Sequence, residues 1–320
     1  MKSAIGRIGL APFLLGGFIS GISFLNLSPP HEKALQERTL TIGYSSRAFS
    51  KGIVNEARVA IDGLANALSA RTSARFAKAS TAIFDDMSTL RNALLRKELD
   101  IVGLVTLGFI EIADSIPMVP FFIATQADRP YFELAIIVRV QDSVQDLKGL
   151  RGKKLAVDTA INELIGTLWL DVLLLETALP ERSSFFSELI NSEKAGQSVL
   201  KVFFGQADAC LTTQRAFETM TELNPQVGKK LRVLRKSPLL LAGVVCVRDD
   251  MSAEDRTAIL DTLGNLQNEP EGGQLLMIMQ IDRLLPFKPE YLQTTSDLLK
   301  KYKGLRAARE NGGQRTRRSP

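Results

Sequence analysis

The sequence contains a single histidine, His31, and this residue precedes the regularly patterned part of the chain. A histidine-based catalytic triad or a histidine metal site is therefore excluded from the body of the protein. The short motifs of dinucleotide-binding loops, P-loops, zinc proteases and nucleophile elbows are missing as well. Carboxylates are plentiful, but they form no distinctive pair. This shortage of acid–base groups favours a binding protein over an enzyme, without a metal or a cofactor.

Cysteine is also scarce. Cys210 and Cys246 each lie in an apolar, strand-like run, and no C-x-x-C or metal-type spacing is present. Two buried thiols are the favoured interpretation, and a single disulfide is the alternative.

Excess positive charge is confined to one end of the chain. The formal net charge is +5, and five arginines lie near the C-terminus: Arg306, Arg309, Arg315, Arg317 and Arg318. Without this tail the body is close to neutral, so we expect no nucleic-acid partner. Residues 305–320 have few apolar side chains and are predicted to be a basic, disordered tail.

The N-terminus has the pattern of an export signal. Lys2 and Arg7 flank an apolar stretch from Ile8 to Leu27, which a Ser-Pro-Pro sequence ends. A positive flank before an apolar run is typical of a secretory signal, and the length of this run also suits a retained anchor. We therefore predict a signal peptide or membrane anchor over residues 1–27 and a linker over residues 28–38.

The rest of the chain alternates strand-like apolar runs with segments of helical apolar spacing. We predict strands at residues 39–43, 74–77, 100–105, 154–157, 185–190 and 207–212. Continuous apolar runs of this kind are typical of parallel strands buried on both faces. The segments that close the two βαβαβ units, LLRKELDIVGLVT and LKVFFGQADACLT, are similar to each other. The chain is thus predicted to be α/β with two similar lobes.

Two further strands, at residues 133–139 and 242–248, belong to neither unit. One precedes the second unit and one follows it, as a chain requires to cross to a second lobe and return. We predict that lobe 1 comprises residues 39–137 plus 240–300 and that lobe 2 comprises residues 141–236.

Small polar side chains follow the predicted strands. In open parallel sheets, ligands bind beyond the carboxyl ends of the strands. Hydroxyls and helix-end N–H groups there can bind an oxyanion, although the same residues are also good helix N-caps. The predicted ligand-binding residues are Tyr44, Ser45, Ser46, Thr106, Asp158, Thr159, Thr212 and Thr213. Asp158 differs in role, because it would accept a proton or an amine from the ligand.

Several segments resemble a known family. Residues 145–158, QDLKGLRGKKLAVD, are similar to the stretch that opens lobe 2 in type II periplasmic binding proteins. Further segments are similar to the phosphate/phosphite/phosphonate-type substrate-binding proteins of ABC transporters: residues 202–220, 222–226, 231–241, 244–252, 269–273 and 287–289. The resemblance implies two lobes, each a mainly parallel sheet flanked by helices. It also implies two hinge strands, closure on a small oxyanion, and delivery to a membrane permease.

The chain departs from that family pattern near the ligand. Thr159-Ala160-Ile161-Asn162 stands where the family often has a Ser/Thr-Ser-Gly cluster, and Phe109 stands where a tyrosine is common. The resemblance therefore leaves the identity of the oxyanion open.

The leading interpretation is a monomeric, extracytoplasmic solute-binding protein that captures a small oxyanion or organic acid for an ABC permease. It would be periplasmic, secreted or tethered to the inner membrane. The alternative is a membrane-anchored sensory or adaptor protein of the same fold, which signals ligand occupancy to a membrane receptor.

An alkaline phosphatase fusion after Leu40 tests export. We expect the fusion to be active in a bacterial host, because a positive flank and an apolar run should carry the reporter out of the cytoplasm. An inactive fusion of normal abundance would contradict this expectation.

Overall fold

The computed structural model describes residues 38–46, 54–71, 76–126, 128–159, 165–279 and 281–317. The predicted signal or anchor at residues 1–27, and all of the linker except Arg38, lie outside these residues. None of the described helices combines the length and the hydropathy that crossing a membrane requires.

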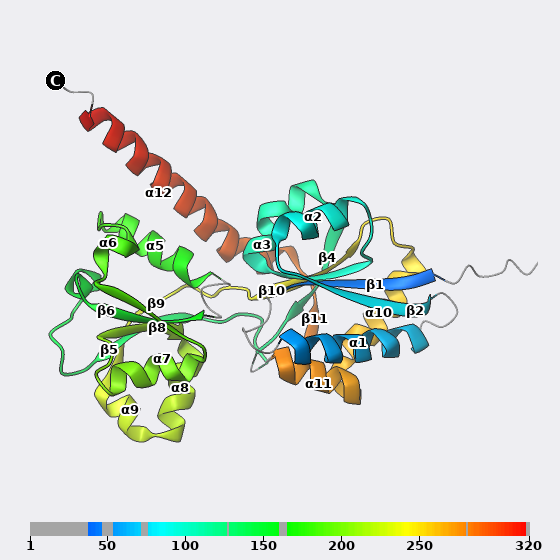
Figure 1. Cartoon of the computed structure of the whole chain (residues 1–320), viewed down its shortest axis with the longest axis horizontal. Helices are drawn as coiled ribbons and strands as arrows, with labels where there is room; N and C mark the ends of the chain where they lie inside the picture. The colour runs from blue at the N-terminus through cyan, green and yellow to red at the C-terminus, as the bar shows by residue number, and fades with distance from the viewer. Residues whose placement is uncertain are drawn as a thin grey trace, which may run out of the picture. The chain divides into compact units, whose positions relative to one another are not determined.

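Two β-sheets form the framework of the described chain (Figure 1). Among the described residues, the first sheet has six strands, in the order β11 (Leu284–Pro286), β4 (Met118–Ala124), β10 (Gly243–Arg248), β3 (Ile101–Val105), β1 (Arg38–Ser45) and β2 (Phe76–Phe84). The second has five, in the order β7 (Glu188–Ser192), β6 (Lys154–Asp158), β8 (Ala209–Thr213), β5 (Leu134–Arg139) and β9 (Leu231–Lys236).

The two sheets repeat one arrangement. In the first, β2, β1 and β3 are parallel neighbours and β10 inserts antiparallel beside β3. In the second, β7, β6 and β8 are parallel neighbours and β5 inserts antiparallel beside β8. The two additional strands predicted from the sequence are β5 and β10. The predicted α/β fold with two similar halves is therefore confirmed. The sheets are mixed and not mainly parallel as expected, because antiparallel pairs are at least as frequent as parallel ones in each.

Helices cover both faces of the first sheet (Figure 1). Ile61, Ile259 and Leu275 pack on one face, from α1 (Val54–Arg71), α10 (Ala253–Gly264) and α11 (Pro270–Met279). Leu90 and Phe109 pack on the other, from α2 (Met87–Leu95) and α3 (Thr106–Ile112). Because both faces are covered, every residue of β3 is buried, which explains its continuous apolar sequence.

Helices cover the second sheet in the same way. Trp169, Phe185 and Leu298 pack on one face, from α5 (Gly166–Glu176), α6 (Arg182–Phe185) and α12 (Gln293–Arg317). Val199 and Val227 pack on the other, from α7 (Ala195–Phe203) and α9 (Pro225–Lys230), and α8 (Gln214–Leu223) packs against α7. Each sheet therefore has its own two-sided hydrophobic core.

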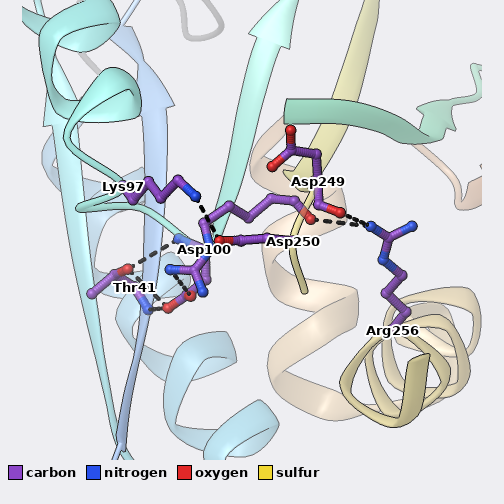
Figure 2. A network of polar contacts seen from close by, with 7 residues as sticks. Thr41, Lys97, Asp100, Asp249, Asp250 and Arg256 are labelled. Carbon is purple, nitrogen blue, oxygen red and sulfur yellow. Dashed lines mark hydrogen bonds and ion pairs between the residues drawn. The ribbon is translucent and has the colours of Figure 1, made fainter. Parts of the chain in front are cut away.

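A buried aspartate joins three strands at the amino end of β3 (Figure 2). The Thr41 backbone N–H and hydroxyl, from β1, donate to Asp100 Oδ2 at 2.9 and 3.0 Å. The guanidinium of Arg248, at the end of β10, lies 3.4 Å from Asp100 Oδ1, and the backbone N–H of Arg248 donates to the Asp100 carbonyl. Lys97 and Arg248 both pair with Asp250 at the rim of this network. We call Asp100 and Arg248 the first clamp.

The second sheet has an equivalent clamp, formed by Asp208 and Arg139. Asp208 Oδ2 accepts the Lys154 N–H, from β6, at 2.9 Å, and Arg139, at the end of β5, lies 3.1 Å from Asp208 Oδ1. Arg139 also donates to the Ala207 carbonyl at 2.7 Å. The two halves thus share strand order and also the polar contacts that fix the strand register.

The chain crosses between the sheets twice, from β4 to β5 and from β9 to β10. Phe132 and Leu240, one from each connection, exchange two backbone hydrogen bonds of 2.9 Å. The Leu241 N–H donates to the buried Thr295 hydroxyl in α12 at 3.4 Å. The two connections and the start of α12 therefore form one hydrogen-bonded junction.

The structure corrects three expectations at segment boundaries. β5 extends to Arg139 inside the second sheet, so residues 134–137 do not belong to lobe 1. Leu298 packs in the core of the second sheet, so the end of the predicted lobe 1 segment does not belong there either. The predicted disordered tail, residues 305–320, is helical as far as Arg317. Leu305 packs against the same core and Arg306 pairs with Glu310 one turn later, which stabilises this helix.

Both cysteines are buried free thiols: Cys210 is in β8 and Cys246 is in β10. Burial raises the pKa of both thiols. The buried-thiol interpretation is therefore confirmed and the disulfide alternative is wrong.

The clamps make a prediction about stability. Asp100→Ala should lower the free energy of unfolding by about 1–3 kcal/mol, because the Thr41 N–H and hydroxyl lose their acceptor while Arg248 keeps Asp250 as a partner. Asp208→Ala should lower the free energy of unfolding by less, because the Asp208 side chain is 28% exposed and that of Asp100 is 5% exposed. Urea unfolding measures both. Glu98→Ala, which breaks a pair exposed on both sides, is the control and should change little. An equal small effect for all three variants would contradict the role of the clamps.

Candidate functional site

The predicted ligand residues of the first half meet at the carboxyl edge of the first sheet. β1 ends at Ser45 and β3 ends at Val105, and the register that pairs Tyr44 with Gly103 brings these ends together. Ser46 follows β1 directly, and Thr106 begins α3. We call Tyr44, Ser45, Ser46 and Thr106 the first edge.

The predicted residues of the second half also meet at one edge. Register pairs Asp158 with Ser192 and Val157 with Leu211, so the ends of β6, β7 and β8 lie side by side. Thr159 follows β6, and Thr212 and Thr213 end β8. We call Asp158, Thr159, Ser192, Thr212 and Thr213 the second edge. All eight predicted residues therefore lie at or directly next to the carboxyl ends of their strands.

Three hydroxyls at these edges are buried and have no hydrogen-bond partner among the described residues. They are those of Thr106, Ser192 and Thr212, whose exposed fractions are 2%, 2% and 0%. A buried hydroxyl without a partner costs about 1–3 kcal/mol. Native folds rarely leave such groups unused, so each requires an explanation. Their location at the sheet edges points to a ligand that supplies the missing hydrogen bonds.

Two other predicted residues have structural partners. Thr213 is the N-cap of α8, and its hydroxyl accepts the Ala216 N–H at 3.1 Å. The Thr159 hydroxyl donates to the Ser192 carbonyl at 3.2 Å. The N-cap interpretation therefore holds for Thr213, and Thr159 joins the ends of β6 and β7.

Ser192 was missed by the sequence prediction because the second strand of the second unit was misplaced. The apolar Phe185 and Phe186 suggested a strand at residues 185–190, but β7 spans Glu188–Ser192. Phe185 instead packs into the core from α6, against Phe186 at 4.8 Å between ring centroids. β7 is an edge strand whose first four residues are only partly buried or exposed, so its sequence carries little apolar signal.

The electrostatics of the edges favour neutral donors. Burial raises the pKa of Tyr44 to about 12, so its phenol stays protonated at neutral pH. Asp158 is buried beside Ser192 and Thr212 and is the acidic member of the second edge. No cluster of three or more His, Cys, Asp or Glu side chains suited to a metal ion occurs within the described ranges. The edges can therefore donate hydrogen bonds to an oxyanion and accept one from it.

The fold and the hydroxyl-bearing edges define the class as a two-lobed binding protein. The family model for "ABC transporter, phosphonate, periplasmic substrate-binding protein" matches residues 54–292. The chain belongs to this family, whose members are binding components of transporters rather than enzymes. The family resemblance seen in the sequence is therefore confirmed.

Solved structures show the same fold at low sequence identity. A Xanthomonas citri protein bound to ATP matches with a TM-score of 0.62 and 16% identity, covering 84% of this chain and 98% of that one. A binding protein of an ABC phosphonate transporter from Pseudomonas aeruginosa matches with a TM-score of 0.59 and 15% identity. The match covers 85% of this chain and 89% of that one. PhnD1 from Prochlorococcus marinus, in complex with methylphosphonate, matches with a TM-score of 0.58 and 14% identity. The match covers 84% of this chain and 99% of that one. No curated protein sequence matches the chain. The type II periplasmic binding fold is confirmed.

A valine scan separates ligand-facing hydroxyls from structural ones. Thr212→Val should raise the free energy of unfolding of the ligand-free protein by about 1 kcal/mol, because it removes a buried hydroxyl that lacks a partner. Thr213→Val should lower it by about 1 kcal/mol, because the α8 cap is lost. Chemical denaturation of the two variants provides the measurement. Equal losses at both positions would show that the Thr212 hydroxyl serves the fold.

Proposed function

We propose that the protein captures a small oxyanion of the phosphonate class between the first and second edges and delivers it to an ABC permease. The observation that carries the proposal is the set of three buried, unpartnered hydroxyls of Thr106, Ser192 and Thr212. These three occur on both sheets, at the carboxyl ends of parallel strands, where open α/β sheets bind ligands. The Ser198 hydroxyl is also buried without a partner among the described residues, but it lies in α7, outside the edges.

Hydroxyl donors suit a tetrahedral oxyanion. Each hydroxyl can donate one hydrogen bond, and bonds to a charged acceptor contribute about 1.5–3 kcal/mol each. α8 begins directly after Thr212 and Thr213, so the positive end of its helix dipole adds to the second edge. The ligand would thus be held by neutral groups, with no buried cation required.

Asp158 restricts the protonation state of the ligand. Its buried carboxyl shares the second edge with Ser192 and Thr212, so a bare dianion would meet repulsion there. A ligand that offers a hydrogen to Asp158 removes this conflict. We therefore propose that the bound species is a monoprotonated phosphonate or phosphate, or an oxyanion that also carries an amine.

Closure of the two halves would occur at the junction of the chain crossings. The two connections pair through Phe132 and Leu240; Leu240 packs in the core of the second sheet and Leu241 in that of the first. Domain closure is absorbed by a few loop residues between bodies that keep their own cores. We propose that these connections act as the hinge and that ligand binding brings the two edges together.

The location, the partner and the oligomeric state of the protein are part of the proposal. The family consists of periplasmic components of ABC transporters, which favours an extracytoplasmic position and a permease partner over a sensory receptor. We propose that the protein acts as a monomer. Residues 1–27 would direct its export or hold it at the membrane.

A thermal-shift and calorimetry panel on the purified protein tests the proposal. The panel contains methylphosphonate, phosphate, phosphite, methanesulfonate and acetate. We expect the phosphorus oxyanions to stabilise the protein, by about 2.7 kcal/mol at 100 times the dissociation constant. Thr212→Val should weaken the binding of methylphosphonate at least tenfold, because one charge-assisted hydrogen bond is lost.

Thr257→Val is the matched control. Thr257 lies in α10, where its hydroxyl donates to the Ala253 carbonyl, and it is part of neither edge. Its affinity for methylphosphonate should equal that of the unmodified protein. Stabilisation by acetate alone, or equal affinities in the Thr212 and Thr257 variants, would contradict the proposed function.

A further inference from the structure

An apolar cavity lies between the first sheet and the helices α10 and α11. Its volume is about 140 Å³. The sheet contributes Ile42, Ile101 and Val245 to its wall, and the helices contribute Leu263, Leu276 and Met279. Hydrophobic side chains thus face the cavity from both layers.

The cavity reaches the first edge. Tyr44, which belongs to that edge, is one of its lining residues. Val105 and Ala242 line it as well, and Val105 directly precedes Thr106, whose N–H donates to the Ala242 carbonyl at 3.1 Å. The cavity wall and the first edge therefore share Tyr44 and adjoin at the step from Val105 to Thr106, so an oxyanion at this edge has the cavity beside it.

A glycine allows the Tyr44 ring to lie at this position. A Cβ atom at residue 103 would be 2.6 Å from Tyr44 Cδ1 and Cε1, which real contacts do not reach. Gly103 therefore permits the Tyr44 ring to pack directly against β3, where it lines the cavity. The phenol keeps its proton, because burial raises the pKa of Tyr44 to about 12.

The size of the cavity indicates the size of its occupant. An engineered apolar cavity of about 150 Å³ in another protein stays free of water and binds benzene. A cavity of 140 Å³ with a similar lining is suited to a group of that size. Water is a poor occupant, because it requires two to four polar partners and Gln126 is one of the few polar residues of the wall.

We propose that the natural ligand is an organic phosphonate or phosphate ester with an apolar substituent of about benzene size, which fills this cavity. The inference rests on the proposed function, since the oxyanion must bind at the edges. The cavity then selects among oxyanions by the apolar group that they carry. Methyl-sized ligands would leave it unfilled.

Isothermal titration calorimetry with phenylphosphonate and methylphosphonate tests the inference. The unmodified protein should bind phenylphosphonate at least tenfold more tightly. Ala124→Leu adds bulk to a residue that lines the cavity. It should abolish this preference and change the affinity for methylphosphonate less than about twofold.

The matched control is Ala79→Leu. Ala79 packs against the same hydrophobic cluster from β2, but it does not line the cavity. This variant should keep the full preference for phenylphosphonate. Benzene provides a test without any substitution: it should compete with phenylphosphonate in the unmodified protein and leave methylphosphonate binding unchanged.

The outcomes distinguish this inference from the proposed function. Equal affinities for the two phosphonates in the unmodified protein, or no competition by benzene, would overturn the cavity inference and leave the oxyanion site standing. Binding of neither phosphonate would overturn both.

Discussion

The clamp at the amino end of each sheet is the contact on which the rest of the arrangement depends. Asp100 ties β1, β3 and β10 together, and Asp208 ties β6, β8 and β5 together. A slip of one residue would turn every side chain to the opposite face, so the buried apolar pattern sets the register. The clamps match only in this register and therefore reinforce it at the amino ends of the parallel strands. They thereby help to hold the residues of the two edges in place.

The two ends of each sheet differ in their polar groups and in what those groups do. The amino ends carry charged groups that satisfy one another, so these groups serve stability. The carboxyl ends carry hydroxyls, three of which are buried without a partner in the described chain. A protein that keeps unsatisfied polar groups at one place accepts a cost in stability there, which a bound ligand can offset. The cavity beside Tyr44 extends the same edge with apolar surface.

Much of this could be predicted from the sequence, because the strands are long apolar runs followed by Ser, Thr or Asp. β3 and β8 are buried on both faces, so their carboxyl ends were predicted at Val105, as found, and at Thr212, one residue before the observed end at Thr213. Ser192 was missed because β7 is an exposed edge strand with little apolar signal. The helical tail was missed because its stability comes from packing Leu305 on a distant sheet. The clamps join residues far apart in the chain, such as Asp100 and Arg248, and composition does not reveal such pairs.

A crystal structure with methylphosphonate tests the central claim most directly, namely that the unpartnered hydroxyls of both edges bind one oxyanion. The account predicts phosphonate oxygens within about 2.5–3.0 Å of the hydroxyl oxygens of Thr106, Ser192 and Thr212 in a single closed site. It also predicts that one phosphonate oxygen lies within hydrogen-bond distance of the Asp158 carboxyl group. A phosphonate bound away from these edges, with the three hydroxyls unchanged, would contradict the account.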